Sequence, residues 1–74
     1  MDDAMLKKML GAEIRRRRNA AGLSQQEFAQ SIGMNRTRIR EIERGEGNPQ
    51  LNTLLRIASG LGTTLQKIFS SISD

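Results

Sequence analysis

Apolar residues recur along this chain with the spacing of α-helices, and no stretch shows the alternation expected of a β-strand. Glycines at positions 22, 33, 45, 47 and 62 interrupt the pattern and divide the chain into five segments with helical periodicity. The pattern therefore predicts an all-α fold of five helices. Because there is no repeat, low-complexity stretch or linker, we expect a single domain over residues 1–74.

The first two segments carry clear helix signals. Residues 3–21 place an apolar stripe around Ile14, and they form the first predicted helix. Ser24 and Glu27 have the spacing of a capping box, which marks the start of the second helix. Gly33 is well placed to end that helix in a left-handed conformation, so a short turn is expected there.

A run of four arginines follows the apolar stripe of the first helix. Residues 15–18 sweep about 300° around the helix axis, so they cannot form one basic face. Arg17 and Arg18 flank the apolar stripe, where each must extend to solvent or find an anionic partner. Arg15 and Arg16 point elsewhere, and we expect them to be solvated.

The third predicted helix, residues 35–44, is unusually polar. Asn35 is a good N-cap for it, and only Ile39 and Ile42 are firmly apolar. The same segment contains four arginines. Such a helix is poorly suited to be scaffold alone, because it has one narrow edge to bury and a wide polar surface. We therefore expect the polar surface of this helix to bind a partner.

The last two helices carry the strongest apolar patterns. In each, apolar residues recur at i, i+3, i+4 and i+7, and Thr64 precedes the fifth helix as a cap. The expected core stripes are Leu51, Leu54, Leu55, Ala58 and Leu61 in the fourth helix, and Leu65, Ile68, Phe69 and Ile72 in the fifth.

Composition excludes several kinds of chemistry. The chain has no cysteine and no histidine, which excludes disulfides, the common zinc sites and catalysis by Ser-His or Cys-His pairs. Glu41 and Glu43 lie two apart on a helix and point in different directions, so they cannot share a metal ion. We therefore expect no enzyme, metal or other cofactor. Apolar runs are short, so no membrane span is predicted and a cytoplasmic protein is the default.

Charge favours a nucleic acid as partner. Lys and Arg number twelve against eight Asp and Glu, which gives a net charge of +4. Nine of the twelve are arginines, whose flat, forked group suits phosphate and guanine. Ten of the twelve lie within the first 45 residues. A solvated basic surface would explain the same balance, but the polar third helix favours nucleic acid.

Two short helices joined around Gly33, the second rich in arginine, have the form of a helix-turn-helix. The positions that make the pattern specific are Leu23, Ser24, Gln25, Phe28, Ala29, Ile32, Gly33, Met34, Ile39, Ile42, Glu43, Arg44, Gly45, Asn48, Pro49, Leu54, Ala58, Leu61 and Gly62. Over roughly residues 10–69 they resemble the phage repressor/Cro-like helix-turn-helix family. The resemblance implies a compact five-helix domain whose third helix enters the DNA major groove.

Within that family, the size of the chain and Asn35-Arg36-Thr37 before Ile39 resemble the controller proteins of type II restriction–modification systems. This implies a homodimeric regulator of transcription that binds a two-fold-symmetric operator in double-stranded DNA. A phage repressor, or an antitoxin that mainly binds a protein partner, remains an alternative. An antitoxin would normally need a disordered tail, of which the sequence has almost none.

The resemblance also implies base-reading positions at Arg36, Thr37 and Glu41, with Arg40 serving either bases or backbone. Arg36 can form a forked pair with guanine, and Thr37 can contact a thymine methyl group. Glu41 can accept a hydrogen bond from cytosine, or it can repel phosphates and so exclude incorrect DNA sites. We favour the second role. Arg36 on a solvated helix edge is the alternative.

Further roles are implied for the DNA backbone and for the protein interior. A buried ion pair of the family falls on Arg18 and Glu43, and the alternative is two independent surface charges. The implied phosphate contacts are Gln25, Asn35, Arg38, Arg44 and Asn48.

A homodimer is expected because a chain this short buries little surface and one recognition helix reads only a few base pairs. The candidate interface is the apolar stripe of the fifth helix, namely Leu65, Ile68, Phe69 and Ile72. We prefer Ile68 and Ile72 outward, and the alternative is that all four belong to the core.

RNA polymerase is a further candidate partner, because activators of the family contact it through acids on the second helix. In this sequence Glu27 is the only acid there. The sequence therefore does not favour activation through that contact.

Overall fold

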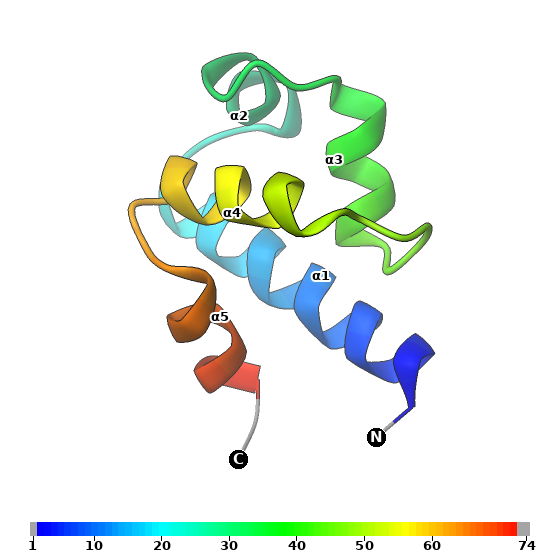
Figure 1. Ribbon diagram of the computed structural model, residues 1–74. Coiled ribbons are helices and arrows are strands. Elements are labelled where there is room, and N and C mark those ends of the chain that lie inside the picture. The colour runs from blue at the N-terminus through cyan, green and yellow to red at the C-terminus, as the bar shows by residue number, and fades with distance from the viewer. Residues whose placement is uncertain (1, 73–74) are drawn as a thin grey trace.

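The computed structural model describes residues 2–72, and this part of the chain contains five helices and no strand (Figure 1). The helices are α1 (Asp3–Ala20), α2 (Gln25–Ser31), α3 (Arg36–Glu43), α4 (Leu51–Gly60) and α5 (Leu65–Ile72). The all-α prediction is confirmed, with helix ends close to those expected. Met1, Ser73 and Asp74, the remainder of the expected domain, lie outside the described residues.

Local signals fix the start of α2 and α3 as the sequence predicts. The Ser24 hydroxyl accepts from the backbone N–H of Glu27, and the Glu27 carboxylate accepts from the backbone N–H of Ser24. The Asn35 side chain accepts from the backbone N–H of Thr37 at 2.7 Å. Gly33 ends α2 with φ +68°, a conformation that glycine adopts without a steric cost. These caps place α2 and α3 at the two ends of a short turn.

The long helix α1 supports the rest of the molecule (Figure 1). Both α3 and α5 pack directly on α1, while α2 packs on α3 and α4 packs on α5. Between them lies an aliphatic core with a single aromatic ring. Its members are Leu10, Ile14, Phe28, Ala29, Ile39, Ile42, Leu54, Ile57, Ala58 and Ile68.

Two helical glycines allow close packing. A Cβ atom on Gly11 would lie 2.3 Å from the carbonyl oxygen of Ile42 and 2.6 Å from that of Glu43. The backbones of α1 and α3 therefore touch, and only glycine fits at the crossing. Gly60 of α4 lies close to side chains instead, because its Cβ would be 2.3 Å from Cγ2 of Ile32, the residue after α2, and 3.2 Å from Cε1 of Phe28 in α2.

The expected stripe of α4 was wrong in part. Leu54 and Ala58 are buried, but Leu51 and Leu55 are 65% and 50% exposed. Ile57, which the stripe omitted, is 1% exposed. The core lies on the Ile57 side of α4, so Leu51 and Leu55, about 60° and 100° round the helix from Leu54, point outward.

The preferred orientation of Ile68 was also wrong. Ile68 is fully buried at 0% exposure, because α5 packs on both α1 and α4 and this side chain belongs to their shared core. Leu65, Phe69 and Ile72 are partly buried at the margin of that core. No helix within residues 2–72 combines the length and the apolar character needed to cross a bilayer.

Candidate nucleic-acid interface

The turn between α2 and α3 is held by main-chain bonds. The backbone N–H of Met34 donates to the carbonyl of Ala29 at 2.8 Å, and that of Gly33 donates to Gln30 at 3.3 Å. Ala29 itself is buried at the helix crossing, where a larger side chain would separate the helices. The turn thus fixes the direction in which α3 projects from the molecule.

The outer surface of α3 carries the four residues expected to read bases. Arg36, Thr37, Arg40 and Glu41 are all exposed and lie within about 140° of the helix circumference. Within residues 2–72 their side chains form no hydrogen bond or ion pair. The opposite edge of α3 is buried through Ile39. The structure therefore presents an open surface with two positive groups, Arg36 and Arg40, and one carboxylate, Glu41, none of which has a partner within residues 2–72.

The expected phosphate contacts are spread around that surface. The Asn35 side chain caps α3, and Arg38 is half-buried on the same helix. Arg44 follows α3 and is exposed, with its Nε 3.9 Å from the Glu46 carboxylate. In the next loop, the Asn48 side chain accepts from the ammonium group of Lys7.

Gln25 has a contact that the sequence interpretation did not anticipate. It is the first residue of α2, and its amide Nε2 donates to Glu43 Oε1 at 3.0 Å. One of its two amide hydrogens is therefore used within the protein. This bond ties the beginning of α2 to the end of α3.

The structure brings Arg18 and Glu43 together as a buried, two-pronged ion pair. Arg18 Nε lies 2.6 Å from Glu43 Oε2, and Nη2 lies 3.0 Å from Oε1. Arg18 Nη1 also donates to the Leu23 carbonyl at 2.7 Å. Hydrogen bonding to the Glu43 carboxylate holds the pKa of the Arg18 guanidinium above its ordinary value. This pair fixes α1, the α1–α2 turn and α3 relative to one another, and both of its side chains are buried.

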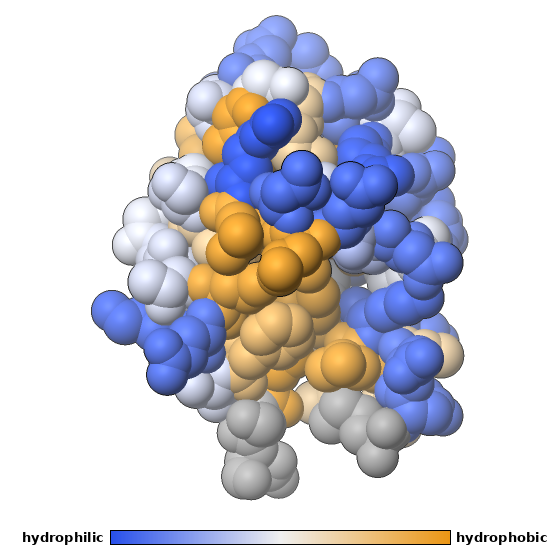
Figure 2. Space-filling view, in the orientation of Figure 1, coloured by the Kyte–Doolittle hydropathy of each residue, from blue (hydrophilic) through white to orange (hydrophobic). Residues whose placement is uncertain are grey.

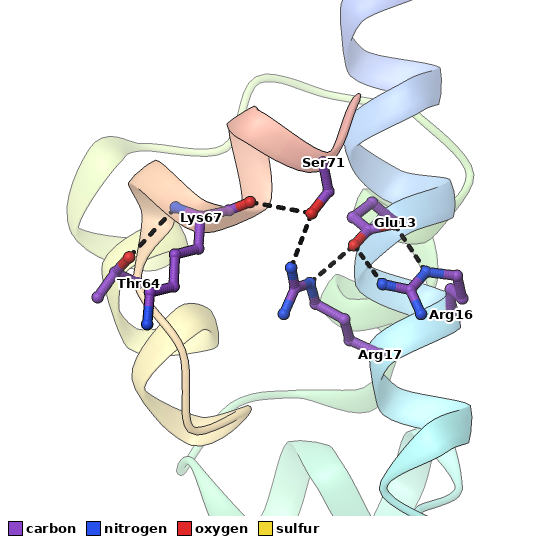
Figure 3. A network of polar contacts seen from close by, with 6 residues as sticks. All are labelled: Glu13, Arg16, Arg17, Thr64, Lys67 and Ser71. Carbon is purple, nitrogen blue, oxygen red and sulfur yellow. Dashed lines mark hydrogen bonds and ion pairs between the residues drawn. The ribbon is translucent and has the colours of Figure 1, made fainter. Parts of the chain in front are cut away.

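A second charged cluster, which the sequence interpretation missed, joins α1 to α5 (Figure 3). Arg16 binds Glu13 through Nε and Nη2 at 2.9 and 2.7 Å, so the expectation that Arg16 is only solvated was wrong. Arg17 donates from Nε to Glu13 at 2.8 Å and from Nη2 to Ser71 of α5 at 2.9 Å. Hydrogen bonding from Arg16, then from Arg17, lowers the pKa of the buried Glu13 from 4.5 to about 2.

The spacing of this cluster was visible in the sequence. Arg16 and Arg17 lie three and four residues after Glu13, the separations at which helix side chains meet. The pairing was missed because the arginines were interpreted only by their positions relative to the apolar stripe. The contact with Ser71, in contrast, depends on how α5 packs.

Apolar side chains gather on a different face. Figure 2 shows the apolar colour concentrated over α4 and α5 and continuing toward the first half of α1. Its exposed members on α4 are Leu51 and Leu55, and Phe69 and Ile72 border it on α5. On α1, Met5 and Leu6 are exposed as well.

The only acid of α2 is engaged locally. Glu27 Oε1 accepts from the backbone N–H of Ser24 at 2.9 Å, and this bond lowers the pKa of Glu27. The carboxylate therefore serves the cap of its own helix.

Known proteins are similar to this chain in sequence and architecture. Control protein C.SmaI from Serratia marcescens is 37% identical over 65 residues, which cover 88% of this chain and 77% of that protein. The crystal structure of the restriction–modification controller protein C.AhdI from Aeromonas hydrophila is similar with a TM-score of 0.80 and 32% identity, over 84% of this chain and 94% of that one. The restriction–modification controller protein C.Esp1396I, solved as a tetramer in complex with its natural 35-base-pair operator, is similar with a TM-score of 0.81 and 27% identity, over 90% and 88% of the two chains.

The family model HTH_3, a helix-turn-helix, matches residues 14–68, which include all of α2, α3 and α4. The match extends over most of the chain and contains both charged residues of the buried pair. The resemblance inferred from the sequence is confirmed: the chain belongs to the helix-turn-helix family HTH_3, and restriction–modification controller proteins are among its relatives.

Proposed function

We propose that this protein regulates transcription by binding a specific, two-fold-symmetric DNA operator as a homodimer, and that the genes it controls belong to a restriction–modification system. The observation that carries the proposal is the exposed surface of α3, where Arg36 and Arg40 have no partner in the described structure. The similarity to controller proteins, one of them solved with its operator, supports the same function.

In this proposal α3 lies in the major groove and reads bases. Arg36 donates two hydrogen bonds to a guanine, and Thr37 contacts a thymine methyl group. Arg40 extends either to a base or to the backbone. Glu41 disfavours sequences that bring a phosphate or an acceptor edge close to it, because an unpaired carboxylate beside another negative group is costly.

Phosphates on either side of the groove are bound by residues that frame α3. Arg38 and Arg44 supply positive charge, and Asn48 supplies an amide from the loop. Asn35 contributes its amide nitrogen, since its oxygen caps α3. Gln25 contributes the amide hydrogen that Glu43 does not use. These contacts set the position of α3 on the duplex but carry no base preference.

The homodimer forms through the apolar face of α4 and α5. Leu51 and Leu55 replace Ile68 in the interface expected from the sequence, because they are exposed and Ile68 is in the core. Phe69 and Ile72 contribute the α5 side of the same face. A second copy of the chain is the partner that fits, since a two-fold operator needs two identical recognition helices about one helical turn apart.

Contact with RNA polymerase through α2 is not part of the proposal. Glu27 is the only acid of α2, and its carboxylate binds Ser24. Regulation therefore rests, in this proposal, on occupation of the operator.

Selection of bound sites from a random duplex library tests the DNA-binding function. The wild type is expected to enrich a two-fold-symmetric sequence with half-sites about 10 base pairs apart. In parallel, Arg36→Ala is expected to lose one guanine preference in each half-site. No enrichment by the wild type at moderate salt would contradict the proposal and favour a protein partner instead.

Sedimentation equilibrium tests the homodimer. The wild type is expected to dimerise, and Leu55→Glu to remain monomeric at the same concentrations, because a carboxylate would be buried in the interface. Gln66→Glu also introduces a carboxylate, but at an exposed and already polar position of α5. It is the control and should still dimerise. A wild type that stays monomeric at every accessible concentration would refute the dimer.

A further inference from the structure

The loop between α3 and α4 lies directly against the first half of α1. Gly45, with φ +76°, is so close to α1 that an added Cβ would lie 2.9 Å from Cα of Lys8. Three residues later, the Asn48 side chain accepts a hydrogen bond from the ammonium group of Lys7. Residues 7 and 48 are far apart in the sequence, so this contact is a product of the fold. It places a positive group of α1 beside the loop that follows α3.

The charge of Lys7 is not neutralised within the described protein. Asp3 lies four residues earlier on α1, at the spacing that favours an ion pair, yet no carboxylate in residues 2–72 lies within 4.0 Å of the ammonium group. The ammonium group is bound instead to a neutral amide oxygen. Lys7 is also half-buried, so its side chain has already lost part of its freedom before any ligand arrives.

The surroundings of Lys7 suit a polyanion. Arg44, at the beginning of the same loop, is exposed, and Glu46, at 3.9 Å, is the one carboxylate of residues 2–72 within 4.0 Å of its guanidinium. Arg44 therefore supplies a positive group at the beginning of the loop, and Lys7 of α1 supplies a second one beside Asn48. A phosphodiester that contacts the Asn48 side chain would lie beside Lys7, which is bonded to it.

We propose that Lys7 binds a DNA phosphate, so that the backbone-binding surface continues from the α3–α4 loop onto α1. This rests on the proposed function and adds to it a contact on a helix outside the helix-turn-helix. The bound group is a phosphodiester of the operator backbone next to the bases that α3 reads. Asn48 acts as the positioning residue for Lys7.

A salt series on the selected operator tests this contact. Lys7→Gln removes one charge per subunit, and Lys67→Gln on α5 removes the same charge far from the loop (Figure 1). For Lys7→Gln, the slope of log K against log salt concentration should become less steep by about 2 per dimer, from two phosphate contacts at about 0.9 each. Lys67→Gln should keep the wild-type slope. Base preference should be unchanged in both variants.

Two further variants separate a phosphate contact from a structural role. Lys7→Arg keeps the charge and should keep the wild-type slope. Lys7→Ala cannot bond Asn48 at all and should give the same reduced slope as Lys7→Gln, with circular dichroism confirming that each variant is folded. An unchanged slope in Lys7→Gln, or an equal change in Lys67→Gln, would overturn the inference while wild-type binding still supported the proposed function. A wild type that binds no DNA would overturn both.

Discussion

The arginines of α1 and those of α3 differ in their partners, although each helix carries several of them. Each arginine at positions 16–18 binds a carboxylate, Glu13 or Glu43. On α3, the side chains of Arg36 and Arg40 have no partner in the described structure. The same residue type therefore serves structure where an acid lies at contact distance, and remains available to a ligand where none does. Arginine content alone does not locate a DNA-binding surface.

The open arrangement on α3 has a cost in the free protein. Arg36 and Arg40 lie four residues apart, and like charges at that spacing destabilise a helix by about 0.2–0.5 kcal/mol. The α1 clusters carry no such cost, because acids compensate them. A polyanion that binds α3 would relieve this repulsion, which is consistent with the proposed function.

Removing Arg18 should give the largest effect and should act on stability. Arg18→Ala leaves Glu43 buried without its counter-charge, and the free energy of unfolding should fall by about 3–5 kcal/mol. Urea denaturation of the two proteins measures the difference. Replacing both partners together, as Arg18→Met with Glu43→Leu, should cost much less. A loss below about 1 kcal/mol in the single variant would mean that the pair contributes no more than a surface ion pair.

Removing Arg36 should give an intermediate effect and should act on binding alone. Arg36→Ala deletes an exposed side chain without an internal partner, so the free energy of unfolding should change by no more than about 0.2–0.5 kcal/mol, the size of its repulsion with Arg40. Binding to the selected operator should weaken by about 1–3 kcal/mol per half-site. Arg15→Ala, which deletes an exposed arginine of α1, is the matched control and should bind nearly as the wild type does. Fluorescence anisotropy measures binding. If both variants lost the same binding free energy, the proposed difference between α1 and α3 would be contradicted.

Neutralising Glu13 should give the smallest effect, with a distinctive pH dependence. Arg16 and Arg17 lower the pKa of Glu13 from 4.5 to about 2, so this carboxylate stabilises the fold above pH 4.5 and ceases to do so as the pH falls toward 2. Glu13→Gln should therefore lose about 1 kcal/mol near neutral pH, since the arginines are partly solvated. Thermal midpoints of both proteins between pH 7 and 2 should converge at the acid end. Parallel curves would show that Glu13 contributes nothing through its charge.

Local chemistry made most of the fold predictable. The capping box of Ser24 and Glu27, the N-cap Asn35 and the left-handed Gly33 act within a few residues, so their positions in the sequence were sufficient. Which face of a helix is buried is not determined by nearby residues alone, because it depends on the helices that pack against it. For α4 it depends on α2 and α5 at once, which is why Ile57 was missed.

The residues of the candidate site also fall into those predictable from local geometry and those that depend on packing. Arg36 and Arg40 could be assigned from the sequence, because helix geometry alone turns them away from Ile39. The bond between Arg17 and Ser71 joins residues 54 positions apart, and that between Lys7 and Asn48 joins residues 41 positions apart. No pattern along the chain encodes these separations, since they arise when α1 packs against α5 and against the α3–α4 loop.

The close contact at Gly11 has a consequence for protein engineering. There α1 supports α3 through main-chain carbonyl groups, those of Ile42 and Glu43, which stay the same whatever side chains α3 carries. Codons 36, 37, 40 and 41 can therefore be randomised as a library while Gly11 and the buried pair are kept. The chain is in this respect a small, cysteine-free scaffold on which new DNA specificities can be selected.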